Sequence, residues 1–151
     1  MEYELKKATK QDISKLIDYE LNNIFEYAGN LTKEEKEQIN QYVKEQVHKQ
    51  LEHYKMIEVN HHKVGCLCIE NKDDGLLINE LYLEENNRNK KIGTNILKQL
   101  LTEWDIVYLW VYKLNKRAIS LYQKLGFSII EETEIRYYMK FSNNNQEDVK
   151  V

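Results

Sequence analysis

The chain has 151 residues, of which 42% are hydrophobic and 31% are charged, and its formal net charge at pH 7 is −3. This length fits a single domain with a substantial core, and the composition is that of a globular chain and not of a disordered one. The small negative charge gives no electrostatic footprint for nucleic acid, so we expect no nucleic-acid partner and a mild preference for cationic ones.

Membrane, export and metal signals are missing from the sequence. No apolar run is long enough to cross a membrane, and the first ten residues contain no signal-peptide hydrophobic region. Cys66 and Cys68 lie two apart on an expected strand, which disfavours a disulfide, and no further cysteine pair completes a zinc site. We therefore expect buried free thiols, no bound metal and a cytoplasmic location without membrane association.

The first part of the chain predicts a strand, two helices and two more strands. Alternation around Tyr3 and Leu5 indicates the first strand. The segments Thr9–Asp12 and Thr32–Glu35 resemble capping boxes, and apolar residues at helical spacing follow each of them. Two joined helices suit a substrate wall or lid, and they suit an ordinary helical hairpin equally well. The next two strands are expected over Tyr54–Val59 and Val64–Ile69.

A central stretch, Leu76–Leu101, predicts a strand, a polar loop over residues 84–91 and a helix that begins near Ile92. Such an arrangement favours anions, because the first N–H groups of the helix lack partners and the helix dipole adds partial positive charge. Phosphate is the anion that it favours most. Three cations add mobile positive charge at the same place: Arg88, Lys90 and Lys91.

The glycine pattern of this loop differs from those of the common nucleotide-binding loops. It contains neither Gly-Lys-Ser/Thr nor Gly-x-Gly-x-x-Gly. Its sequence is Arg88-Asn89-Lys90-Lys91-Ile92-Gly93. By itself this segment fits either a phosphate loop or a solvated basic loop in front of an ordinary helix.

The last part of the chain predicts a buried strand, a short helix and two final strands. Ile106–Tyr112 is almost continuously apolar, as in a strand covered on both faces. A short helix is expected over Asn115–Lys124, with Gly126 at its C-terminal end. We expect one domain over residues 1–141 and a polar, disordered tail over residues 142–151. The final strands are expected over Phe127–Ile130 and Ile135–Phe141.

The short helix carries a second motif, Asn-x-x-Ala-x-x-Leu-Tyr-x-x-Leu-Gly-Phe, from Asn115 to Phe127. Spacing alone makes Tyr122 a core aromatic residue. The motif nevertheless resembles a signature of the GNAT acetyltransferase superfamily at every specified position. Arg88–Gly93 resembles the Gln/Arg-x-x-Gly-x-Gly/Ala loop with which that superfamily binds pyrophosphate, except that Lys91 replaces its first glycine. The two motifs come in the order usual for the superfamily, and the resemblance covers nearly the whole chain.

The resemblance implies an α/β (α+β) GNAT fold, with a mixed central sheet of about seven strands, roughly four helices, and parallel fourth and fifth strands that splay apart. It implies acetyl-coenzyme A as acyl donor, with its pantetheine arm bonded to free backbone groups of the fourth strand. One such N–H group could also stabilise the oxyanion. Asn115 would contact the pantetheine or simply cap its helix. The residues assigned to the cofactor in this way are Leu81, Tyr82, Leu83, Arg88, Asn89, Lys90, Lys91, Ile92, Gly93, Thr94 and Asn115.

The implied reaction is acetyl transfer to a primary amine by direct attack in a ternary complex. It needs a base and an acid, because an ammonium group cannot attack and a thiolate leaves better when it is protonated. Tyr122 matches the superfamily's usual acid. Glu80 is our candidate for the base, since strand alternation places it on the face opposite to Leu81 and Leu83. Alternatively, Glu80 binds the acceptor's ammonium while water is the base, or lies on a solvated face.

We predict a small cationic acceptor, polyamine- or aminoglycoside-like, because acidic and aromatic side chains could line a pocket for it. A peptide N-terminus or lysine is the alternative, although Leu77 and Trp110 occupy positions where peptide-directed relatives carry glutamate. A non-catalytic acyl-CoA-binding module is a third possibility, which Lys91 favours and Tyr122 opposes. An exposed edge strand would permit a homodimer. The pocket candidates are Glu20, Glu26, Glu80, Glu84, Glu85, Tyr19, Phe25, Tyr27, Tyr137 and Tyr138.

Overall fold

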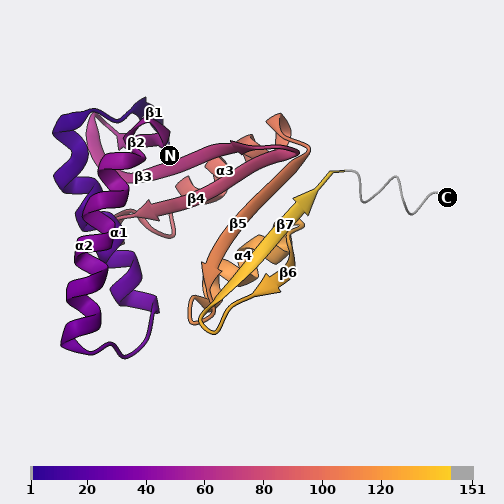
Figure 1. Ribbon diagram of the computed structural model, residues 1–151. Helices are drawn as coiled ribbons and strands as arrows, with labels where there is room; N and C mark the ends of the chain where they lie inside the picture. Colours follow the sequence, from indigo (N-terminus) through magenta and orange to yellow (C-terminus); the bar gives the residue numbers. More distant parts are fainter. Residues whose placement is uncertain (1, 144–151) are drawn as a thin grey trace.

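A seven-stranded mixed sheet runs through the computed structural model, which describes residues 2–143. Its strand order is β1-β2-β3-β4-β5-β7-β6, and only the β4–β5 pair is parallel (Figure 1). With four α-helices, this confirms the fold that the resemblance implied. The strands are β1 (Glu4–Lys7), β2 (Tyr54–Val59), β3 (His62–Lys72), β4 (Gly75–Leu83), β5 (Ile106–Tyr112), β6 (Ser128–Glu132) and β7 (Arg136–Ser142). The α-helices are α1 (Ile13–Tyr27), α2 (Lys33–Lys49), α3 (Ile92–Glu103) and α4 (Lys116–Leu125).

Helices α1 and α2 form a hairpin that covers one face of β2, β3 and β4 (Figure 1). The predicted capping box opens α2: Thr32 Oγ1 accepts a hydrogen bond from Glu35 N at 3.1 Å, and Glu35 accepts one from Thr32 N at 2.9 Å. A buried apolar cluster holds the hairpin on the sheet, so it forms a fixed wall over β4. The fully or almost fully buried members of this cluster include Leu16, Val43, Val47, Met56 and Cys66.

Helices α3 and α4 cover the opposite face of the sheet (Figure 1). The apolar stripe predicted for α3 is buried at Ile92, Ile96, Leu97 and Leu100. These residues join the larger of the core clusters, which fixes the N-terminus of α3 against the end of β4. The loop between β4 and α3 is thereby held close to the point where β4 and β5 separate.

Strands β4 and β5 are paired over only part of their length. The parallel pairing runs from Leu76 opposite Val107 to Ile78 opposite Leu109. Beyond these residues β4 continues to Leu83 without pairing to β5, so its backbone groups on that edge lack a strand partner among the described residues. The predicted splaying of the fourth and fifth strands is therefore confirmed.

A β-bulge at Asn79 changes which side chains of β4 point to which face. Ile78 pairs with Ile69 of β3, but Glu80 pairs with the adjacent Cys68, so Asn79 is an extra residue on β4. Uninterrupted alternation from Ile78 would direct Glu80 into the core beneath α3. The bulge instead turns the Glu80 side chain toward α1.

The face beneath α3 is consequently lined by even-numbered residues before the bulge and by odd-numbered residues after it. Leu81 and Leu83 pack on the α3 side, whereas Tyr82 belongs to the cluster beneath α1 and α2, with Glu80 on that same side. The expectation that Glu80 lies opposite Leu81 and Leu83 is thus correct.

The remaining boundary differences are small. The hairpin turn between β2 and β3 has only two residues, Asn60 and His61, both with positive φ, so β3 begins earlier than predicted. Helix α4 starts at Lys116, one residue after its N-cap. Ser142 still belongs to β7, and the rest of the predicted tail, from residue 144 onward, lies outside the described residues.

Two further expectations concern the cysteines and the sheet edge. Cys66 and Cys68 are buried free thiols, as predicted, and burial raises the pKa of both. Strand β6 forms an edge of the sheet with every residue exposed, and the homodimer suggested by such an edge stays a prediction. None of the helices in residues 2–143 has the length and apolar character needed to span a membrane.

Candidate functional site

Two cavities meet where β4 and β5 separate. The first, which we call the loop groove, measures about 690 Å³ and lies among the end of β4, the loop that follows, the start of α3, and α4. The second, the helix-side cavity, measures about 340 Å³ and lies between the α1–α2 hairpin and strands β4 and β5. Both are large enough for small-molecule sites. Four residues line both cavities: Asn23, Leu81, Asn115 and Tyr122.

The loop groove collects nearly all residues that the sequence assigns to the cofactor. Every one of them lines it except Lys90, whose side chain is exposed. Arg117, Leu97 and Leu121 add to its walls and were not predicted. The N-terminal turn of α3 points its free N–H groups toward this groove, as an anion site requires.

The loop carries two residues in the left-handed region, Asn89 at φ +63° and Lys91 at φ +66°. A left-handed conformation costs an L-residue with a side chain roughly 1–2 kcal/mol, and glycine avoids most of that cost. A glycine, which the resembling motif has at the position of Lys91, would adopt this conformation without that cost. The chain here carries a residue that is strained in it.

Gly93 is the opposite case, because the fold itself does not need a glycine there. Its φ is not positive, and an added Cβ would lie 3.6 Å from Leu83 Cδ1, which is an ordinary contact. A glycine inside a helix is nevertheless less favourable than alanine by about 1 kcal/mol. Since Gly93 lines the loop groove, the missing side chain leaves room for a ligand to approach the backbone.

Arg88 is held in place and is not the mobile cation that the sequence suggested. Its Nε donates a hydrogen bond of 2.8 Å to the Leu83 carbonyl, and its Nη1 lies 3.1 Å from a carboxylate oxygen of Glu26 on α1. The guanidinium also lies over the Tyr82 ring at 5.2 Å from its centroid. Arg88 therefore ties the loop to α1, and Glu26 offsets part of its charge.

Tyr122 lies at the junction of the two cavities. It is half-buried on α4, with its ring 5.8 Å from that of Phe127, so the core role suggested by spacing is real. Its hydroxyl makes no hydrogen bond to any residue of the described range 2–143. Burial raises the pKa of Tyr122, and the charge of Glu80 raises it further, so the hydroxyl keeps its proton at neutral pH. It is equipped to donate a proton.

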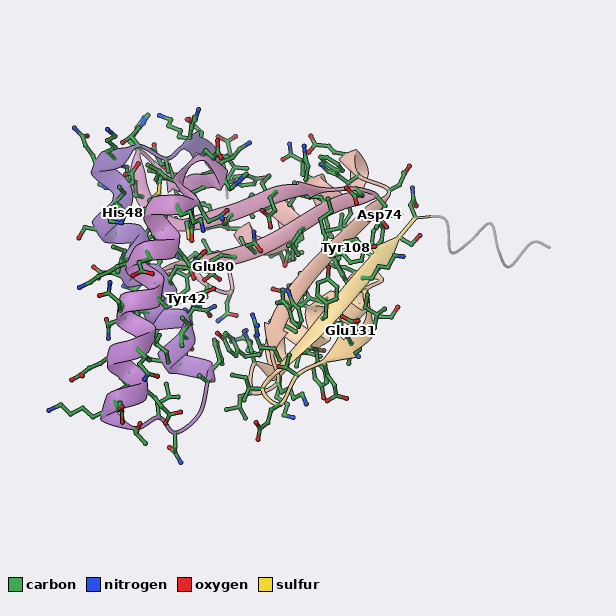
Figure 2. The ribbon with its side chains drawn as sticks, viewed as in Figure 1. Tyr42, His48, Asp74, Glu80, Tyr108 and Glu131 are labelled. Atoms are coloured by element: carbon green, nitrogen blue, oxygen red, sulfur yellow. The ribbon has the colours of Figure 1, made fainter. Side chains whose placement is uncertain are left out.

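Glu80 lies on the helix-side cavity and is only 7% exposed, so the solvated-face interpretation is wrong. Figure 2 shows it between β4 and the helix hairpin. Asn23 Nδ2 on α1 donates to its carboxylate at 3.1 Å. Glu20, one turn earlier on α1, lies beside it and accepts a hydrogen bond from the buried Tyr54 hydroxyl.

The surroundings of Glu80 favour its protonated form. Burial raises the pKa of Glu80 well above its usual range, and the neighbouring charge of Glu20 raises it further. Together the two carboxyl groups form an acidic wall of the helix-side cavity.

Asn115 caps the N-terminus of α4, which was the structural alternative to a role in cofactor binding. Its side chain accepts a hydrogen bond from Ala118 N at 3.2 Å and caps α4. Because it also lines both cavities, its predicted contact with pantetheine remains a prediction.

The other pocket candidates divide between the two cavities or lie outside both. Glu26, Tyr27 and Glu85 line the loop groove, and Glu20 joins Glu80 in the helix-side cavity. The Tyr19 hydroxyl donates to Glu84 at 2.5 Å, away from the two cavities. Those that line neither cavity are Tyr19, Phe25, Glu84, Tyr137 and Tyr138.

Sequence reasoning missed several residues of the helix-side cavity. They come from elements far apart in the chain, and none belongs to a local sequence motif that predicts a site. The missed residues that bring polar groups to the cavity include Asn23, Gln50, Tyr54, Tyr112 and Arg136.

Across residues 2–143, no group of three or more His, Cys, Asp or Glu side chains is arranged to hold a metal ion.

Comparisons with known proteins agree with this architecture. The sequence profile of the Acetyltransferase (GNAT) domain matches residues 50–129. Among curated proteins, the chain is 37% identical over 65 residues to the uncharacterized N-acetyltransferase YobR of Bacillus subtilis, an alignment that covers 39% of this chain and only 26% of YobR.

Solved structures show the same fold over almost the full length. The paiA N-acetyltransferase of Thermoplasma acidophilum, in complex with coenzyme A, has a TM-score of 0.75 and 21% identity, covering 94% of this chain and 99% of its own. Arabidopsis thaliana Naa50, in complex with the bisubstrate analogue CoA-Ac-MVNAL, has a TM-score of 0.64 and 21% identity over the same shares. With a family profile that matches just over half of its residues and this shared fold, the chain belongs to the GNAT acetyltransferase family.

Proposed function

We propose that the protein is an acetyl-CoA-dependent N-acetyltransferase that acetylates a primary amine of a small cationic acceptor. One observation carries the proposal: Tyr122 and the Glu80–Glu20 pair lie at and beside the junction of two cavities of different chemical character. The loop groove offers backbone donors, whereas the helix-side cavity offers a buried acidic wall. That division suits an anionic donor on one side and a cationic acceptor on the other.

The loop groove fits a coenzyme A moiety. Its helix N-terminus supplies free N–H groups for phosphate, and the space at Gly93 lets a ligand reach the backbone. The unpaired edge of β4 over Leu81, Tyr82 and Leu83 can bond an extended amide chain as an added strand would. When bound, acetyl-CoA would supply the thioester whose acetyl group is transferred. The paiA relative, solved with coenzyme A, has the same fold.

Tyr122 is proposed as the acid. Its hydroxyl keeps its proton at neutral pH and faces the junction without a hydrogen-bond partner in residues 2–143. A hydroxyl in that state can donate to a leaving sulfur as the thioester breaks. The packing of its ring against Phe127 supports this role, because it fixes the hydroxyl in one position.

The Glu80–Glu20 pair is proposed to hold the acceptor's ammonium and to take up its proton. Negative charge on these carboxyl groups attracts a cation into a cavity of low dielectric constant. A carboxyl group with a raised pKa is also a stronger base than an ordinary glutamate, so it is better matched to an ammonium proton. Asn23 keeps Glu80 oriented.

A peptide acceptor is the second candidate, since the structure shares its fold with Naa50, which was solved with a bisubstrate analogue. Against it, the helix-side cavity is small and is walled by the α1–α2 hairpin. The predicted cytoplasmic location is retained in this proposal, because acetyl-CoA and small amines are available there.

The test is release of free thiol from acetyl-CoA in the presence of polyamines, aminoglycosides, amino acids and short peptides, one at a time. Acceptor-dependent release would support the proposal and give the substrate class. Tight binding of coenzyme A by calorimetry without release in any panel member would favour a non-catalytic acyl-CoA-binding protein. If coenzyme A does not bind and no panel member causes thiol release, the assignment of the loop groove is contradicted.

A further inference from the structure

We infer that the acceptor carries a carboxylate in addition to its amine, and that Arg136 binds this carboxylate in the helix-side cavity. The inference rests on the proposed function and narrows it to one class of acceptor, an amine with a carboxylate a few bonds away. It follows from the position, the stacking and the free donors of a single arginine.

Arg136 is the first residue of β7 and lies opposite Tyr112, the last residue of β5. Its half-buried side chain lines the helix-side cavity, and the guanidinium carbon lies 4.5 Å from the centroid of the Trp110 ring. Trp110 lines the same cavity. Stacking on an aromatic face fixes the guanidinium plane and leaves its N–H edge available for hydrogen bonds.

The Arg136 guanidinium has no acidic partner within residues 2–143. Other cations of the protein do have one: Arg88 pairs with Glu26, and Lys113 pairs with Glu132. No side-chain hydrogen bond forms from Arg136 to the described residues either. A guanidinium offers five donors in a planar fork that matches a carboxylate with two parallel hydrogen bonds. A half-buried arginine left without acceptors is suited to receive one from a ligand.

Arg136 forms a cationic wall and the Glu80–Glu20 pair an acidic wall of one small cavity. Tyr112 is close to both: burial raises its pKa, Arg136 lowers it, and Glu80 and Glu20 raise it. The whole cavity measures about 340 Å³, which suits a molecule of amino-acid size. A ligand that satisfies both walls must therefore carry an ammonium and an anion in one short molecule.

A simple polyamine does not satisfy both walls. One of its ammonium groups would suit Glu80 and Glu20, but a second cation directed at Arg136 would be repelled. An amino acid with a side-chain amine, such as lysine or ornithine, remains cationic overall and adds the anion that Arg136 lacks. Its side-chain ammonium therefore binds Glu80 and Glu20, as proposed for the acceptor, and its carboxylate forms an ion pair with Arg136.

The test uses pairs of acceptors that differ only in the carboxylate: lysine against cadaverine, and ornithine against putrescine. For the wild type we expect kcat/KM to favour the carboxylate-bearing member by about 10- to 100-fold, the range of one charge-assisted hydrogen-bonded contact. Arg136→Gln should abolish that preference by lowering kcat/KM for lysine and by raising kcat/KM for cadaverine, whose second ammonium is no longer repelled. Calorimetry on the protein saturated with coenzyme A should show the same loss in lysine affinity.

Matched controls separate this role from a structural one. Lys140→Gln removes another cation of β7, which lies over the Tyr108 ring outside the cavity. It should leave kcat/KM unchanged for both lysine and cadaverine. Coenzyme A affinity should be the same in Arg136→Gln, because Arg136 does not line the loop groove. Arg136→Lys should restore only part of the preference, since an ammonium lacks the planar fork.

Three results would decide the matter. Equal use of lysine and cadaverine by the wild type, or an equal loss of both in Arg136→Gln, overturns the inference while acetyl transfer itself stands. Arg136-dependent turnover restricted to short peptides with an aspartate beside the reacting amine supports the carboxylate but assigns it to a peptide side chain. If no amine of any kind releases thiol, the proposed function fails and this inference fails with it.

Discussion

The loop groove and the helix-side cavity touch each other, yet they are built in different ways. The loop groove is formed largely by one continuous run, from the end of β4 through the loop into α3, with α4 as its far wall. The helix-side cavity takes side chains from α1, α2, β2, β3, β4, β5, α4 and β7. The first combines free backbone groups of β4 and α3 with basic side chains from the loop and α4, and the second places a buried acidic pair beside one arginine. A cofactor site can thus be encoded locally, whereas an acceptor site depends on how distant segments meet.

Tyr122 belongs to both cavities, so its substitution should have the largest effect. Tyr122→Phe keeps the packed ring and removes the proton donor, and we expect kcat to fall by roughly 10- to 1000-fold with coenzyme A affinity nearly unchanged. Steady-state kinetics and calorimetry measure the two quantities. Tyr108→Phe, on strand β5 and outside both cavities, is the control (Figure 2). Equal rates for wild type and Tyr122→Phe would leave Tyr122 as a core residue only.

Gly93→Ala should affect the loop groove alone. The added methyl group fits the free protein, so the free energy of unfolding should rise by about 0.5–1 kcal/mol, while coenzyme A affinity should fall by about 10-fold because the methyl group occupies the path of the ligand. Chemical denaturation and calorimetry give the two numbers. Unchanged coenzyme A binding would mean that no ligand approaches the backbone at this position.

Glu80→Gln should affect the helix-side cavity alone, with a clear dependence on pH. A carboxyl whose pKa is raised by folding lowers the free energy of unfolding as pH rises from about 4 through that raised pKa. The glutamine cannot ionise, so it should raise Tm by about 3 °C at pH 8 and leave Tm unchanged at pH 4. The KM for the amine should rise several-fold, and coenzyme A affinity should not change.

Glu131→Gln, on the exposed strand β6, is the matched control for that experiment (Figure 2). It should alter neither Tm nor KM, since surface substitutions of this kind change stability little. A rise in Tm for Glu80→Gln that is the same at pH 4 and pH 8 would show that Glu80 is not held with a raised pKa.

Lys91→Gly should have the smallest effect and should concern the loop alone. Glycine relieves the left-handed conformation at φ +66°, so the free energy of unfolding should increase by about 1 kcal/mol without weakening coenzyme A binding. Lys90→Gly is the control, because Lys90 has no positive φ and glycine there should lower stability. A large loss of coenzyme A affinity in Lys91→Gly would show that the lysine side chain itself binds phosphate.

The sequence predicted the fold and the loop groove well, because both depend on local patterns. Capping at Thr32, the apolar stripe of α3 and the two motifs each follow from residues close together in the chain. The strand ends of β2 and β5 were predicted to the residue. Hydrophobic periodicity and turn chemistry are sufficient for such features.

The helix-side cavity could be predicted only in part. Glu80 was found by its place relative to the loop motif, but its pairing with Glu20 and Asn23 requires α1 to pack on β4 at one particular register. Arg136 gave no signal, since an arginine at the start of an edge hairpin has the pattern of a solvated residue. The fixed geometry of Arg88 was missed for the same reason, as Glu26 is distant in sequence.

The extra residue at Asn79 has a consequence for how this strand can change over time. Before the bulge, Ile78 packs in the hydrophobic core beneath α3, and after it Glu80 faces the helix-side cavity. A substitution of Glu80 can therefore alter acceptor preference without disturbing the packing before the bulge. Deleting Asn79 would restore regular alternation with Glu80 still opposite Cys68, so both faces of the strand would be kept. Deleting Glu80 while the bulge at Asn79 is kept would instead turn the residues after it to the other face and place Leu81 where the glutamate stands.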